Sequence, residues 1–97
     1  MSENPKFAVI KDYLKRKFPN STIDQRIDFD RGAQTFKVIM TGNTLLLKVG
    51  NEFVSDNEAP EIVGLFDRWS LAEILEKETE LGVLVTARGV ETFRRGT

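Results

Sequence analysis

The chain has 97 residues, of which 40% are hydrophobic and 30% are charged, enough apolar side chain for one core but not two. It contains no cysteine and no histidine, which excludes disulfides, thiolate or imidazole metal sites, cysteine nucleophiles and histidine proton transfer. The formal net charge is −1, and no apolar run is long enough to cross a bilayer. These features predict one soluble, cytoplasmic domain over residues 1–97, with no membrane partner.

The first predicted element is an amphipathic helix that begins at Pro5 and ends near Phe18. Its apolar residues recur at spacings of three and four, the period of one helix face: Phe7, Ile10, Leu14 and Phe18. The basic run at 15–17 falls in the last turn, where cations favour the negative end of the helix dipole. Pro19 then ends the helix.

A three-stranded antiparallel meander is predicted over residues 23–29, 35–40 and 44–49, because the apolar period changes to two. The turns fall at 30–33 and at Gly42-Asn43, which are rich in residues that adopt positive φ. A two-residue loop at Gly42-Asn43 places Met40 opposite Leu45 and Phe36 opposite Val49. The first turn then places Ile27 opposite Phe36, on the same side of the sheet.

Residues 51–61 are polar and contain Pro60, which predicts a loop. A helix is expected next, since apolar residues recur at helical spacing: Ile62, Leu65, Phe66 and Trp69. Ser70 with Glu73 has the form of a capping box, so a second helix or a continuation starts there and ends at Leu81-Gly82. Residues 83–87 predict a short last strand, and residues 88–97 add a turn with a few extended residues or fray.

The predicted fold class is therefore α+β: a helix, a three-stranded antiparallel meander, one or two helices and a short C-terminal strand, with the helices on one face of the sheet. A strand and helix alternation typical of doubly wound parallel sheets is missing. Whether the other face is covered by the C-terminal strand or by a second chain is open at this point.

The outward face of the meander is the first candidate site. In the predicted register, Arg26, Lys37 and Lys48 lie side by side across three strands, and Asp24, Ile39 and Leu46 form the next row. Like charges placed opposite each other destabilise a sheet. Either aspartates pair diagonally with these cations on a solvated face, or an anion or acidic partner binds there. Ile39 and Leu46 form a small apolar spot that a fourth strand or a partner chain would cover.

Charge is unevenly distributed along the chain. The net charge is +4 over residues 1–50, −7 over residues 51–80 and +2 over residues 81–97. The acidic helices are expected to lie beside the basic first helix, and a field that attracts a partner is the second interpretation.

The helix, three strands and helix of residues 5–80 resemble the order in double-stranded RNA-binding domains. That resemblance implies nucleic-acid binding through the basic row on the sheet and the basic first helix, with Arg94 and Arg95 at the far end of the chain. Those domains present lysines at the start of their second helix, whereas residues 51–80 are acidic here and would repel phosphates.

The element order also resembles the core of restriction-type endonucleases and the dimeric chaperones of type III secretion. A nuclease needs a carboxylate two residues before a lysine on the third strand, but Leu46 precedes Lys48. No metal site can be built there, so no catalytic residue, metal or cofactor is expected.

The sequence predicts a non-enzymatic protein interaction or adaptor module that forms a homodimer. Its partner is a second copy or another protein, and nucleic-acid binding is the alternative. The candidate partner-binding residues are Ile39, Leu46, Arg26, Lys37, Lys48, Phe66 and Trp69. Trp69 and Phe66 are also explained as core residues, because large aromatic side chains dominate core burial.

Overall fold

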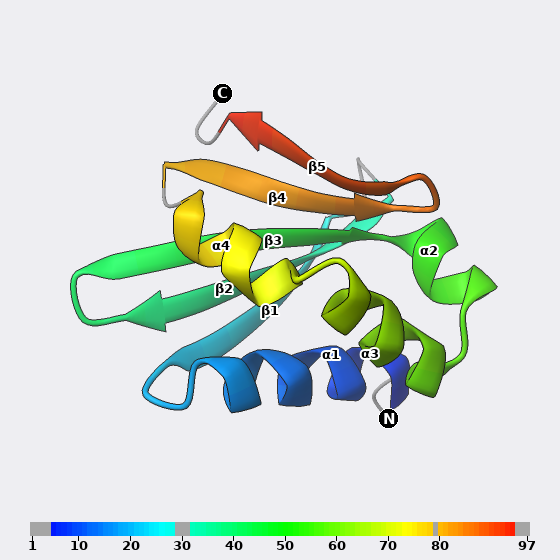
Figure 1. The fold of residues 1–97 in the computed structure, drawn as a ribbon, viewed down its shortest axis with the longest axis horizontal. Coiled ribbons are helices and arrows are strands. Elements are labelled where there is room, and N and C mark those ends of the chain that lie inside the picture. The colour runs from blue at the N-terminus through cyan, green and yellow to red at the C-terminus, as the bar shows by residue number, and fades with distance from the viewer. Residues whose placement is uncertain (1–4, 29–31, 79, 95–97) are drawn as a thin grey trace.

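The computed structural model describes residues 5–28, 32–78 and 80–94, which form four helices and five strands (Figure 1). The fold is α+β, as predicted. The elements in chain order are α1 (Pro5–Lys17), β1 (Thr22–Asp28), β2 (Ala33–Met40), β3 (Asn43–Gly50), α2 (Asn51–Asp56), α3 (Ala59–Arg68), α4 (Leu71–Lys77), β4 (Leu81–Thr86) and β5 (Gly89–Arg94).

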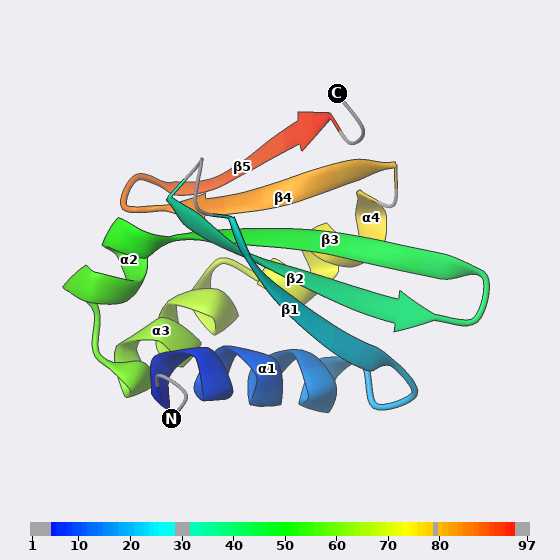
Figure 2. The same cartoon turned by 180° about the vertical axis from the view of Figure 1, so that it is seen from behind.

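The five strands form one mixed sheet in the order β1-β2-β3-β4-β5. Strands β1 to β3 are the predicted antiparallel meander, β4 is parallel to β3, and β5 is antiparallel to β4. The helices lie on one side of the sheet, and the view from behind shows the strands in front (Figures 1 and 2). Residues 81–94 therefore extend the sheet beside β3 and do not cover its other face.

The predicted strand register is wrong by two residues. Val38 pairs with Leu45, Phe36 pairs with Leu47, and Gln25 pairs with Phe36. The β2–β3 loop is Thr41-Gly42, since Met40 pairs with Asn43, and Gly42 supplies a φ of 86°. Because side chains alternate with a period of two, a shift of two residues leaves each side chain on its predicted face.

Two boundaries in the helical region also differ from the sequence prediction. Residues 51–56 are helical (α2), and Pro60 lies in the first turn of α3, where a missing N–H costs nothing. Helix α4 ends at Lys77, so Leu81 begins β4 and does not end a helix.

The expected capping box at Ser70 and Glu73 does not form. Ser70 has a left-handed backbone (φ 54°), and its side chain makes no capping hydrogen bond. The helix start that does show this pattern is at α3, where the Glu58 amide donates to Glu61 Oε1 at 3.0 Å.

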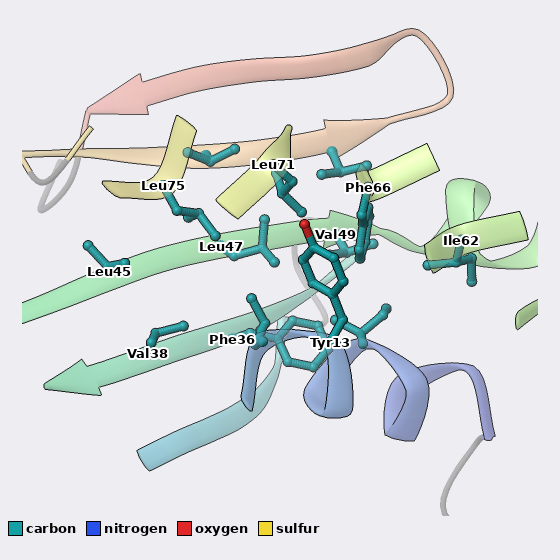
Figure 3. Close-up of a cluster of buried hydrophobic side chains, with 14 of the residues drawn as sticks. Tyr13, Phe36, Val38, Leu45, Leu47, Val49, Ile62, Phe66, Leu71 and Leu75 are labelled. Atoms are coloured by element: carbon teal, nitrogen blue, oxygen red, sulfur yellow. The ribbon is translucent and has the colours of Figure 1, made fainter. Parts of the chain in front are cut away.

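The core lies between the sheet and the helices (Figure 3). Helix α1 contributes Ile10, Tyr13 and Leu14, all at most 1% exposed. Figure 3 shows the Tyr13 side chain reaching from α1 toward Leu71. Its ring meets that of Phe66 edge-on, with 5.2 Å between the centroids. The sheet contributes alternate residues: Phe36, Val38, Leu45, Leu47, Val49, Val83 and Val85.

Candidate functional site

The open face is the side of the sheet that carries no helix, and Figure 2 shows it toward the viewer. Pairing between strands places these side chains on it: Asp24 and Arg26 from β1, Thr35, Lys37 and Ile39 from β2, Leu46 and Lys48 from β3, Leu84 from β4, and Glu91 and Phe93 from β5. Five of the seven predicted partner-binding residues thus lie on one surface.

The cations of the open face are not abreast, which corrects the predicted rows. Arg26 pairs with Thr35, and Thr35 pairs with Lys48. Lys37 lies between Asp24 and Leu46. In this arrangement no two cations lie directly opposite each other on neighbouring strands, as they would in the register predicted from the sequence. Arg26 Nε also lies 3.4 Å from Asp24 Oδ2, in an exposed pair.

The second predicted row, Asp24 with Ile39 and Leu46, is also corrected. Ile39 pairs with Thr22 and Thr44, and it is therefore diagonal to Leu46. Ile39 is 41% exposed, and in the described part of the chain no other large hydrophobic side chain is exposed to this extent. Leu46 beside it is half-buried.

Strands β4 and β5 extend this apolar surface with Leu84 and Phe93, which sequence reasoning missed. Phe93 pairs with Gly82, and a side chain at Gly82 would overlap the Phe93 ring. The ring therefore lies across the β4 backbone. Lys48 Nζ lies 5.1 Å from the centroid of the same ring, within the range of a cation–π contact. The β-prone sequence at 83–87 was the available signal, but it does not reveal which strand it pairs with.

The two aromatic residues predicted from α3 do not lie on the open face. Phe66 is fully buried between Tyr13 and Phe53, so its ring belongs to the core and offers no surface to a partner. Trp69 is half-buried, with its ring centroid 5.8 Å from that of Phe53. A partner-binding role for Trp69 stays a prediction.

The basic first helix is separate from the open face. Helix α1 lies with α3 on the helical side near β1, whereas β5 lies at the opposite edge of the sheet (Figures 1 and 2). Arg94 is therefore far from the helix, and Arg95 lies outside the described residues, as do residues 30 and 31 of the predicted turn at 30–33. Lys15 and Arg16 line a shallow groove with Val9 and Val63. The cations of α1 and of the sheet do not form one surface.

A metal site is not found in the part of the chain that the structure describes. No cluster of three or more acidic side chains there could hold a metal ion. None of the described helices is long and apolar enough to cross a membrane. The cytoplasmic location stays a prediction.

Comparisons with protein families, with curated proteins and with solved structures find no match. The geometry of the open face is therefore the basis for inferring function.

Proposed function

We propose that this chain is a non-enzymatic interaction domain that binds another protein through its open face. The observation that supports this is the one-sided burial of a five-stranded sheet. Helices cover one face, while the other exposes Ile39 next to half-buried Leu46, Leu84 and Phe93. Contiguous apolar surface of this kind, bordered by charged side chains, is typical of interaction sites.

The charges on the open face indicate the chemistry of the partner. Three cations border the apolar residues, namely Arg26, Lys37 and Lys48, and the acidic side chains that the structure describes on this face are Asp24 and Glu91. Complementary potentials favour a correct partner and repel wrong ones. The open face thus fits a protein segment in which apolar residues alternate with acidic ones.

An NMR titration of the isotope-labelled protein tests this proposal. The probe is a synthetic peptide of alternating leucine and glutamate, and its matched control replaces each glutamate with lysine. We expect the acidic peptide to shift the amide signals of Ile39, Leu46 and Leu84, and the basic peptide to leave them unchanged. Equal shifts with both peptides, or none with either, contradict the proposal.

Two variants locate the binding surface in this titration. The double variant Ile39→Asp, Leu46→Asp should lose the acidic peptide, because it places negative charge within the apolar surface. The double variant Thr41→Asp, Ala87→Asp adds the same charge at two exposed turn residues and should retain binding. Loss of binding in both variants would show that net charge and not the open face decides affinity.

Nucleic-acid binding remains the alternative, since three cations lie on the open face. A duplex RNA probe distinguishes it, because RNA affinity falls steeply with salt whereas an apolar protein contact responds little. Salt-sensitive RNA binding that is lost in Arg26→Ser, Lys37→Ser, Lys48→Ser, together with no response to the acidic peptide, would replace the protein-binding proposal.

A further inference from the structure

Helix α3 has an outward side that is exposed and points away from the sheet (Figure 1). The helical period places three exposed residues in one line along this side, Glu61, Gly64 and Arg68, which we call the α3 stripe. Half-buried Val63 and Leu65 lie on either side of it. The buried residues of α3 face the core.

Gly64 lies in the middle of the α3 stripe, and the described part of the chain does not require a glycine there. Its φ is not positive, and a side chain would meet nothing within 4 Å. The missing side chain leaves a shallow hollow of about 340 Å³, which Asn57, Glu61, Leu65 and Arg68 also line. Glycine inside a helix costs stability, but it lets a second backbone approach closely. The hollow is therefore where a neighbouring molecule can come nearest to α3.

We infer that two copies of this chain join through antiparallel packing of their α3 helices, which cross at Gly64. The two-fold axis lies between the two helices and is perpendicular to both. With a helical rise of about 1.5 Å per residue, Glu61 lies about 4.5 Å to one side of Gly64 and Arg68 about 6 Å to the other. Antiparallel packing therefore brings Glu61 of each copy opposite Arg68 of the other. The inference makes the predicted homodimer specific and does not depend on peptide binding by the open face.

The charges of the α3 stripe favour a second copy as the occupant and determine the crossing point. A two-fold interface has to be complementary to itself, and the stripe carries one anion and one cation on opposite sides of Gly64. Crossing at Glu61 or at Arg68 would place two like charges at the axis, and parallel packing would place Glu61 opposite Glu61. Both arrangements are unfavourable. The open face, whose described side chains include more cations than carboxylates, is less suited to pair with itself.

Contacts within each copy support the pairing of Glu61 with Arg68. The Glu58 amide donates to Glu61 Oε1 at 3.0 Å, which turns this carboxylate toward the start of α3. Arg68 of the other copy lies on that same side. The Asp67 carboxylate, also on the exposed side of α3, lies 3.7 Å from Lys17 Nζ of its own copy, which offsets its charge. The half-buried apolar residues beside the stripe add contact between the helices.

Charge reversal tests the inference by light scattering. We expect the wild-type chain to have twice the monomer mass of 11.0 kDa. Arg68→Glu and Glu61→Arg should each have the monomer mass, because each variant places like charges opposite each other at both ends of the crossing. An equimolar mixture of the two variants should return to the dimer mass, since the acidic stripe of one then faces the basic stripe of the other.

A matched control makes the same change of charge elsewhere. Arg88→Glu alters an exposed residue of the β4–β5 turn and should remain a dimer. Circular dichroism establishes that each variant is folded. A wild-type chain that is monomeric at all concentrations overturns the inference, as does a mixture of the two stripe variants that stays monomeric. A dimer that persists in both single variants overturns it as well.

An engineered disulfide gives a second readout if a charge variant fails to fold. The chain has no cysteine, so a single introduced cysteine can link only to its counterpart in another copy. Under oxidation Gly64→Cys should form a covalent dimer, because residues at the crossing point lie within the reach of a disulfide. Thr41→Cys, in the exposed β2–β3 turn, should not. Absence of the link in Gly64→Cys, or equal linkage in both variants, refutes the crossing.

The variant Ile39→Asp, Leu46→Asp separates this inference from the proposed function. It should remain a dimer even though it no longer binds the acidic peptide. If it becomes a folded monomer, the interface lies on the open face and the α3 inference is wrong.

Discussion

At the scale of single residues, the absence of a side chain at Gly82 allows the Phe93 ring to lie against the β4 backbone. The Phe93 ring occupies the place of a Gly82 side chain, and Lys48 lies over the ring. An aromatic residue on a neighbouring strand thus covers a glycine backbone that would otherwise be exposed on the open face.

We expect Gly82→Ala to lower the free energy of unfolding by about 1–3 kcal/mol, because the new methyl group displaces the ring. The matched control is Gly64→Ala in α3, where a methyl group would meet nothing within 4 Å. That change should raise stability by about 0.5–1 kcal/mol through helix propensity. Urea denaturation measures both, and an unchanged Gly82→Ala would contradict the contact.

Tyr13 is the second residue whose surroundings alter its chemistry. Its side chain is 1% exposed. Burial raises the pKa of the Tyr13 hydroxyl, a hydrogen bond from the Ala72 amide opposes the rise, and the Asp67 carboxylate adds to it. Because the folded pKa exceeds the unfolded value of 10.0, the folded state holds this proton more tightly. Stability is therefore present below pH 10 and declines as pH rises above it.

The titration of Tyr13 can be followed directly, since it is the single tyrosine of the chain. Ultraviolet absorbance of tyrosinate should give a midpoint above 10.0 in the folded protein and close to 10.0 in denaturant. Tyr13→Phe should reduce the loss of stability at alkaline pH. A folded midpoint equal to the denatured one would show that the hydroxyl is solvated.

At the scale of elements, the helix boundaries depend on backbone geometry as well as on residue type. Ser70 follows α3 in a left-handed conformation, and its amide donates to the Asp67 carbonyl at 3.2 Å. The residue therefore ends α3, and its side chain does not cap α4. Glu58 and Glu61 form the capping interaction at the start of α3.

Two matched alanine substitutions test this assignment. Glu61→Ala should reduce the free energy of unfolding by about 0.5–1 kcal/mol, since it leaves the Glu58 amide without its side-chain acceptor. Glu73→Ala occupies the equivalent place in the expected but unformed box and should cost less. Urea denaturation of both variants decides, and an equal or larger loss for Glu73→Ala contradicts the structure.

At the scale of the whole molecule, the fold separates the charges that the sequence carries in blocks. Helix α1 packs beside α3, and Lys17 Nζ lies 3.7 Å from Asp67 Oδ1. Both side chains are about half exposed, so this pair adds little stability. The acidic helix α3 and the basic helix α1 lie side by side on one side of the sheet, as the charge distribution predicted. Arg26, Lys37 and Lys48 lie on the other side, on the open face.

Because the two sides of the sheet differ in charge, the oligomeric state in solution indicates which surfaces of two copies join. An open face bound to the acidic helices of the next copy would grow into an open assembly, whereas a two-fold interface stops at two copies. A scattering mass that levels off at the dimer with rising concentration agrees with a two-fold interface. A mass that keeps rising indicates the other mode.

The sequence by itself determined the fold class, helix α1, the three-stranded meander and the face of each of its side chains. The apolar period of a helix, about four residues, and that of a strand, two residues, are properties of the local sequence. They can therefore be recognised without knowing which strand pairs with which. The placement of Ile39, Leu46, Arg26, Lys37 and Lys48 on one face followed from this alternation.

Only the tertiary structure decided the register, the parallel pairing of β4 with β3 and the position of β5 at the edge. Gly42, and not Asn43, supplies the positive φ of the loop, a choice between two suitable turn residues that the sequence left equal. In β5, Val90 and Phe93 face opposite sides of the sheet, so no alternation marks the strand. Phe66 is buried because residues distant in the chain surround it. Pairings between distant segments leave no periodic trace in either segment alone, and therefore the extent of the open face emerged only from the assembled sheet.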